Sequence, residues 1–279
     1  MNFTEKLQAA VRESNSTLCV GLDPNLELLP NVISDQGQLP TRQVAHFLKK
    51  VIDVTHKYCA AYKPNIGFFE ALGAEGIDIF VEILEYIPEN KVVIADAKRG
   101  DISSTAEHYA KAFFEQFDVD SVTLNPLMGF ETLEPFLTED AKGIYVLTLT
   151  SNQGASDILL KKISSSQTVA SYIATELKKQ QSHSRTTIGM VVGATNAEEL
   201  RPIMNKFPNA PLLIPGVGKQ GGSITKLTDV LQSHKGIPLI NSSRSIIYAG
   251  NNQKDWQKSV ANSAKDLKEK LSPITNKYV

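Results

Sequence analysis

Eight short apolar segments recur along the chain, and this repetition limits the possible folds more than any other feature. Most are continuous rather than alternating, as expected for strands buried on both faces of a sheet. The expected strands are Thr17–Leu22, Tyr58–Lys63, Lys91–Ala95, Ser121–Leu124, Gly143–Leu149, Thr187–Val192, Pro211–Ile214 and Ile237–Ile240.

Segments with helical periodicity separate these strands, because their apolar residues recur every three or four positions. The expected helices are Gln43–Lys57, Gly76–Tyr86, Ser104–Phe117, Leu133–Ala141, Ser166–Lys179, Ala197–Phe207, Ser223–Ser233 and Lys254–Leu271. Asn196 and Ser223 are of a type that caps helix N-termini.

Strand and helix therefore alternate eight times, which predicts a (β/α)8 barrel. Met1–Glu13 is expected to form an extra helix that closes the bottom of the barrel. The chain has 279 residues, close to the roughly 250 that such a barrel needs. No change of composition marks a boundary, so we expect a single domain over residues 1–279. A doubly wound parallel sheet is the alternative.

The composition argues against several classes of protein. The net charge is −1, so no basic field favours nucleic acid or a membrane surface, although a local pocket can still bind a small anion. No segment approaches the roughly 18 apolar residues of a membrane span, and Met1–Ser14 lacks the apolar core of a signal peptide. Cys19 and Cys59 lie in apolar segments, as buried thiols of a reducing compartment do. We expect a soluble cytoplasmic protein.

Polar residues gather where the predicted strands end. In a (β/α)8 barrel, the loops after the carboxyl ends of the strands build the active site. The residues at these ends are Asp23, Lys63, Asp96, Lys98, Asn125, Thr150, Ser151, Asn152, Gly193, Pro215, Ser242, Ser243 and Arg244.

The central charged segment runs from Asp96 to Asp101. Residues two apart on a strand share a face, so Asp96 and Lys98 can point into one pocket, with Asp101 beyond them in a turn eased by Gly100. Alternatively, the segment is a solvated charge cluster in which Asp101 helps to cap the next helix.

Lys63 ends the preceding strand. It can be a lysine that merely reaches water. If it lies near Asp96, the two charges neutralise one another and fix each other's rotamers.

The glycine-rich loop Pro215–Gly222 allows a close approach of backbone N–H groups to an anion. These groups, with the start of the following helix, can form a phosphate cradle, and Arg244 can add a bidentate bond. A merely flexible turn is the other interpretation.

These motifs, in this order, resemble the signature of the orotidine 5′-phosphate decarboxylase family. The resemblance spans Leu18 to Gly250 and is closest to the longer bacterial branch (type 2). It is carried by Gly21-Leu22-Asp23-Pro24, Tyr62-Lys63-Pro64-Asn65, Asp96-Ala97-Lys98-Arg99-Gly100-Asp101-Ile102, Ser104-Thr105-Ala106, Pro215–Gly222 and Ser242–Ala249.

The resemblance implies decarboxylation of orotidine 5′-phosphate to UMP, the last step of de novo pyrimidine synthesis, without metal or cofactor. It also implies a homodimer with shared active sites, acting on a small nucleotide and not on nucleic acid or a membrane. Lys63, Asp96, Lys98 and Asp101 would form a charged catalytic array, with Lys98 as the cation and acid at C6. Asp101 and Thr105 would reach the neighbouring subunit's site.

The same resemblance implies the substrate contacts. Asp23 would bind ribose hydroxyls, Ser151 the pyrimidine edge, and Pro215 would line the base pocket. The phosphate would be held by Gln220, Ser243 and Arg244. Ser243 lies at a position where glycine is also usual in the family, and its hydroxyl can add a phosphate contact. Asn125 receives no role.

Two other functions are compatible with parts of this pattern. A Mg²⁺-dependent phosphosugar decarboxylase or aldolase of the same superfamily shares the Asp-x-Lys-x-x-Asp motif, but it needs an acidic metal ligand where this chain has Lys63. A non-catalytic nucleotide-binding barrel is the alternative from another class, since a fold does not fix a function.

Overall fold

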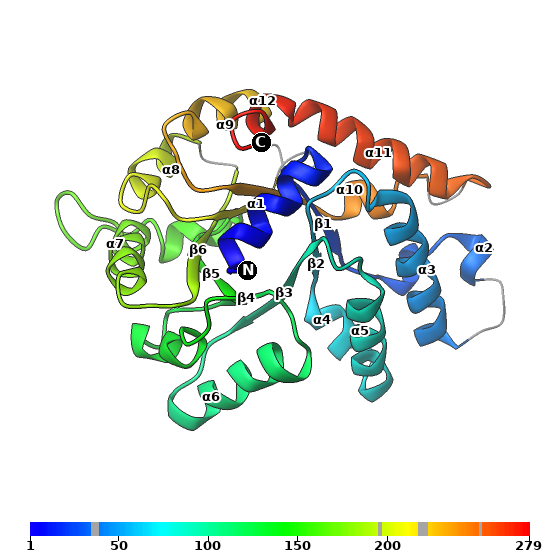
Figure 1. The fold of residues 1–279 in the computed structure, drawn as a ribbon, viewed down its shortest axis with the longest axis horizontal. Helices are drawn as coiled ribbons and strands as arrows, with labels where there is room; N and C mark the ends of the chain where they lie inside the picture. The colour runs from blue at the N-terminus through cyan, green and yellow to red at the C-terminus, as the bar shows by residue number, and fades with distance from the viewer. Residues whose placement is uncertain (35–38, 195–196, 217–222, 251–252) are drawn as a thin grey trace. The chain divides into compact units, whose positions relative to one another are not determined.

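The computed structural model describes residues 1–34, 39–194, 197–216, 223–250 and 253–279. Within them, eight strands follow chain order in a closed barrel with parallel pairing (Figure 1). Closure confirms the predicted (β/α)8 barrel, because a doubly wound sheet is open at its edges. The strands are β1 (Leu18–Leu22), β2 (Ala61–Pro64), β3 (Val92–Arg99), β4 (Ser121–Leu124), β5 (Gly143–Leu149), β6 (Thr187–Val192), β7 (Leu212–Ile214) and β8 (Pro238–Ser242).

Helices connect the strands. The α-helices are α1 (Phe3–Ser14), α2 (Asn31–Ser34), α3 (Pro40–Thr55), α4 (Ile66–Glu70), α5 (Ala74–Tyr86), α6 (Ser103–Lys111), α7 (Val169–Gln181), α8 (Ala197–Met204), α9 (Ile224–Leu231), α10 (Arg244–Ile247), α11 (Trp256–Lys270) and α12 (Ser272–Thr275). Short 3₁₀ or π turns form η1 (Leu26–Leu28), η2 (Ala112–Gln116), η3 (Phe130–Phe136) and η4 (Gln153–Asp157).

One predicted helix is wrong. Leu133–Ala141 is not an α-helix, since the chain there forms η3, which ends at Phe136 and contains Pro135. Proline lacks the N–H group that an α-helix interior needs. Ser223 caps α9 as predicted, by accepting a hydrogen bond from the Lys226 N–H group. Asn196 lies outside the described residues.

The chain gathers into two compact units. The first unit contains Met1–Gln8 and Lys98–Ile240, and the second contains Ala9–Ala97 and Asn241–Val279. The single domain expected from the sequence stays a prediction.

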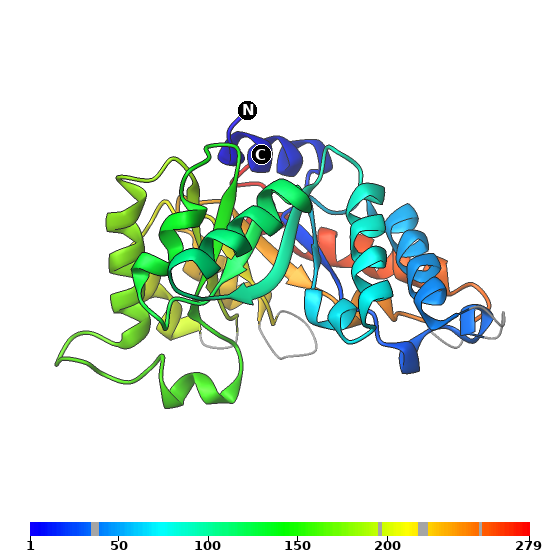
Figure 2. The same cartoon turned by 90° about the horizontal axis from the view of Figure 1, so that it is seen from below.

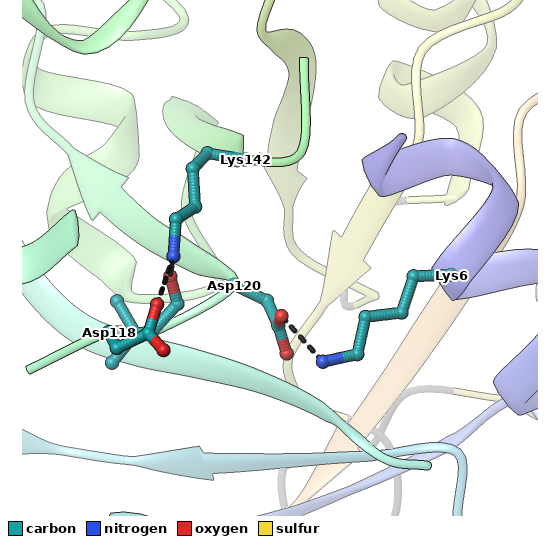
Figure 3. Close-up of polar contacts among 5 residues, drawn as sticks. Lys6, Asp118, Asp120 and Lys142 are labelled. Carbon is teal, nitrogen blue, oxygen red and sulfur yellow. Dashed lines mark hydrogen bonds and ion pairs between the residues drawn. The ribbon is translucent and has the colours of Figure 1, made fainter. Parts of the chain in front are cut away.

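Ion pairs stabilise the amino ends of the strands in the first unit. Lys6 of α1 lies 2.6 Å from Asp120, just before β4 (Figure 3). Lys142, just before β5, lies 2.6 Å from Asp118 and also donates to the Val119 carbonyl. These contacts lie at the opposite ends of the strands from the predicted site residues.

In the second unit, α3 and α5 lie side by side outside the strands (Figures 1 and 2). The ring of Phe47 on α3 packs between Tyr248 and Trp256, with centroids 5.5 Å and 5.4 Å away. Trp256 thereby packs the last long helix, α11, against α3.

Both cysteines are buried free thiols, as predicted. Burial raises the pKa of Cys59 to about 11 and raises that of Cys19 still further. No helix among the described residues is long and apolar enough to cross a membrane.

We therefore expect neither thiol of the native protein to react with a disulfide reagent at pH 8. A raised pKa keeps the thiol protonated, and the thiolate is the reactive form. The measurement is absorbance of the released thiolate from Ellman's reagent, before and after unfolding in urea. Rapid reaction of either cysteine in the folded protein would contradict this account, while two reactive thiols after unfolding are the internal control.

Candidate active site

A buried ion pair joins the ends of β2 and β3. The Nζ atom of Lys63 lies 2.5 Å from Oδ2 of Asp96, and the two side chains are only 6% and 10% exposed. The parallel register brings them together, because Ala61 pairs with Val92 and the same alignment continues towards Asp96. The family resemblance implied this proximity, whereas the catalytic roles of the two residues stay predictions.

The charge of Lys63 is stabilised by its neighbours. Burial alone would lower the pKa of a lysine, since it disfavours the charged form. The carboxylates of Asp96 and Asp23 oppose this effect and raise the pKa of Lys63 above its ordinary value. Lys63 is therefore a cation at neutral pH, and its charge attracts the two carboxylates of Asp96 and Asp23.

Asp23 follows β1, the strand next to β2. Gly21 pairs with Lys63 in the register of these strands, and Asp23 lies two residues further along. Its Oδ1 atom is buried and has no hydrogen-bond partner among the described residues. Such an oxygen is costly to leave unpaired, so a donor from a bound molecule would satisfy it.

Ser243 and Arg244 follow β8. Ser243 is the N-cap residue of α10, but its side chain makes no capping bond. Its buried Oγ atom has no hydrogen-bond partner in the part of the chain that the structure describes. Gly21 permits its close approach, since a Cβ atom there would lie 2.7 Å from the Ser243 Cβ. Arg244 is exposed.

Lys98 lies two residues beyond Asp96 on β3 and belongs to the first unit. Its φ of 49° is left-handed, and its N–H group donates to Thr123 Oγ1 at 2.9 Å. Side chains alternate only along an extended backbone, so alternation does not set the direction of the exposed Lys98 side chain. Its position beside Asp96 stays a prediction. A left-handed lysine costs about 1–2 kcal/mol, and such strain is frequent at functional sites.

The turn after β3 carries Asp101. A Cβ atom at Gly100 would lie 2.6 Å from the Asn125 carbonyl oxygen, so this turn requires glycine. Asp101 accepts a hydrogen bond from the Ile102 N–H group, and Ile102 rather than Asp101 is the N-cap residue of α6. The capping role considered for Asp101 is therefore wrong. Thr105 lies exposed on the first turn of α6.

Ser151 follows β5 and is half-buried. Gly193, at the end of β6, donates to the Leu149 carbonyl at 2.7 Å. A Cβ atom at Gly193 would lie 2.7 Å from both the nitrogen and the Cα of Ser151, so Gly193 sets the path of that loop. Pro215 follows β7 and is half-buried. Gln220 lies outside the described residues.

Gly21, Gly193 and Tyr248 support these segments but received no individual role from the sequence. The two glycines had a detectable signal, since Gly21 lies in the last part of an apolar strand and Gly193 directly follows one. Tyr248 had none beyond its place in the Ser242–Ala249 motif. In the part of the chain that the structure describes, no three His, Cys, Asp or Glu residues are placed to hold a metal ion.

Fold and site together define a (β/α)8-barrel enzyme, with charged residues at the carboxyl ends of its strands. A sequence profile described as "Orotidine 5′-phosphate decarboxylase / HUMPS family" matches residues 16–259. An orotidine 5′-phosphate decarboxylase from Dehalococcoides mccartyi (strain CBDB1) is 36% identical over 280 residues, which is 100% of both chains.

Solved structures agree with this result. The OMP decarboxylase of Leishmania donovani is 30% identical with a TM-score of 0.82, over 99% of this chain and 100% of that one. The UMP synthase of the same organism is 32% identical with a TM-score of 0.84, and this chain spans 57% of its length and is itself covered to 99%. The chain belongs to the orotidine 5′-phosphate decarboxylase / HUMPS family.

We predict that Lys63→Met lowers the free energy of unfolding by about 3–5 kcal/mol, because it removes the positive charge that lies against the buried carboxylate of Asp96. The double variant Lys63→Met/Asp96→Leu should recover much of this loss, since apolar residues of similar volume replace a buried pair well. Urea denaturation at pH 7 measures both.

The control is Lys50→Met, which breaks the exposed Lys50–Asp53 pair of the same unit. Its cost should stay below about 1 kcal/mol. A double variant no more stable than Lys63→Met alone would contradict the electrostatic explanation.

Proposed function

We propose that this chain decarboxylates orotidine 5′-phosphate to UMP and CO₂, the last step of de novo UMP synthesis, in the cytoplasm and without metal or cofactor. The observation that carries this proposal is the buried Lys63–Asp96 pair. It puts a cation at the end of β2, where the Mg²⁺-dependent enzymes of the superfamily need an acidic ligand. Family membership over the length of the chain supports the same reaction.

The difficulty of the reaction lies in its intermediate. When the bond between C6 and the carboxylate breaks, the electron pair stays on C6 as a vinylic carbanion that resonance barely stabilises. A cation placed where this charge develops stabilises the transition state most. Lys98 is that cation, and it then delivers the proton to C6.

The remaining charges order the site. Asp96 lies next to the departing carboxylate, and its repulsion disfavours the ground state. Lys63 and Asp101 keep the array ionised and fix its rotamers. The raised pKa of Lys63 and its 2.5 Å contact with Asp96 support this division of roles.

Substrate binding uses groups on both sides of the reacting carbon. Asp23 accepts from the ribose hydroxyls, for which its unpaired buried Oδ1 atom is suited. Ser151 and Pro215 contact the pyrimidine. Ser243, Arg244 and Gln220 hold the phosphate, whose binding energy can be used to orient the ring.

We further propose a homodimer in which Asp101 and Thr105 serve the neighbouring subunit's site. Exposed apolar side chains near this segment support a covered surface, since Ile102, Leu127 and Met128 are 52%, 58% and 52% exposed in the single chain. Large apolar groups gathered on a surface often mark an interface.

The direct test is the loss of orotidine 5′-phosphate absorbance in the presence of EDTA, for which we expect unchanged turnover. Lys98→Ala should reduce turnover by 10²–10⁴-fold, roughly the contribution of a positioned acid, and more where the lost cation also matters. It should still fold and bind UMP, because Lys98 acts on the reacting carbon rather than on the phosphate.

Lys178→Ala is the control, because this lysine is exposed on the outer helix α7. Turnover lost with EDTA would favour a metal-dependent relative, and UMP binding without turnover in the wild type would favour a non-catalytic barrel. Near-normal turnover by Lys98→Ala would remove that residue from the mechanism.

The shared site predicts complementation between two inactive variants. A heterodimer of Lys98→Ala and Asp101→Ala subunits contains one site with both residues intact. Random reassociation of equal amounts makes half of the dimers mixed, and each mixed dimer has one intact site out of two. The mixture should therefore show about a quarter of wild-type activity. A mixture as inactive as its components would show that each site uses its own Asp101.

A further inference from the structure

Tyr248 ties the segment after β8 to the segment after β1, inside the second unit. Its hydroxyl donates to the Asp23 carbonyl oxygen at 3.0 Å and accepts from the Asn25 N–H group at 2.5 Å. The hydroxyl therefore holds the backbone on both sides of Pro24. Proline fixes its own φ and restricts the residue before it, so this short segment keeps few alternatives once both ends are held.

The ring of Tyr248 is itself fixed. It stacks on Phe47 with an interplanar angle of 10°, and Phe47 is fully buried. Burial raises the pKa of Tyr248 to about 12, so the hydroxyl keeps its proton and remains a donor at neutral pH. The side chain therefore connects the end of α10 to the backbone of Asp23 in one fixed orientation.

The side chain of Asp23 depends on this backbone. Its Oδ1 atom is buried without a partner among the described residues, and its charge acts on Lys63. Among the described residues, no hydrogen bond holds Oδ1 of this carboxylate, whereas the carbonyl oxygen of the same residue accepts a hydrogen bond from Tyr248. The position of the peptide group therefore sets where the carboxylate can lie.

We propose that Tyr248 is a positioning residue, which holds Asp23 so that its carboxylate meets the ribose hydroxyls of the nucleotide. This inference rests on the proposed function. Tyr248 would not touch the substrate itself and would act on its binding through Asp23 alone. Tyr248 also follows Arg244 by four residues, so one short segment carries a phosphate contact and the support of the ribose contact.

The test compares Tyr248→Phe with the wild type in calorimetric binding of two nucleotides, UMP and 2′,3′-dideoxyuridine 5′-monophosphate. Phenylalanine keeps the stack on Phe47 and removes both hydrogen bonds. The affinity for UMP should fall about tenfold, as expected for the loss of one or two hydrogen bonds. The affinity for the dideoxy nucleotide should not change, because it has no hydroxyl for Asp23 to bind.

Two controls complete the design. Tyr86→Phe removes the bond of an exposed tyrosine to Asp53 in the same unit and should change neither affinity. In an Asp23→Ala background, Tyr248→Phe should cause no further loss of UMP binding, whatever its effect on the melting temperature.

Unchanged UMP affinity, or an equal loss for both nucleotides, would overturn the role of Tyr248. So would a full further loss in the Asp23→Ala background. Absence of orotidine 5′-phosphate turnover in the wild type would overturn the proposed function instead, since the two nucleotide affinities judge Tyr248 by binding alone.

Discussion

The Lys63–Asp96 ion pair is the contact on which the rest of the site depends. Removing two charges from water is costly, and only close geometry with further favourable charges repays it. Here the 2.5 Å contact and the nearby Asp23 hold Lys63 as a cation despite its burial. One lysine beside two carboxylates leaves this cluster of three side chains with one negative charge in excess. On the proposed function, the cation that balances this charge is Lys98, which follows Asp96 by two residues along β3.

Close approach of loops at the strand ends depends on three glycines. At each of them an added Cβ atom would come within about 2.7 Å of a neighbouring residue. The neighbour is Ser243 for Gly21, Asn125 for Gly100 and Ser151 for Gly193. None of the three needs a left-handed backbone, since none has a positive φ. Space is the constraint at all three, because protein interiors leave no room for an added methyl group. The strand ends can then place polar side chains close together without cavities between them.

The sequence predicted the barrel well because burial on both faces produces continuous apolar segments. The bounds of β4, β5 and β6 agree with those expected. β3 runs four residues past its predicted end, to Arg99, because charged residues carry no strand signal. The predicted helix Leu133–Ala141 was wrong, because Pro135 interrupts α-helical hydrogen bonding there. The proximity of Lys63 and Asp96 was foreseeable, since neighbouring parallel strands end side by side. The bond between Tyr248 and Asp23 joins residues 225 positions apart, and no local pattern encodes such a contact.

The second unit contains a continuous path of contacts from Arg244, the proposed phosphate contact, to the buried cation Lys63. Arg244 begins α10, and Tyr248 is the C-cap residue that follows it. The tyrosine holds the backbone of Asp23, whose charge helps to raise the pKa of Lys63. Interactions remote from the reacting carbon accelerate a reaction only if they are converted into placement or charge at that carbon. On the proposed function, this path performs such a conversion through hydrogen bonds and packed rings. Binding at one end of the nucleotide is then coupled to the electrostatics at the other.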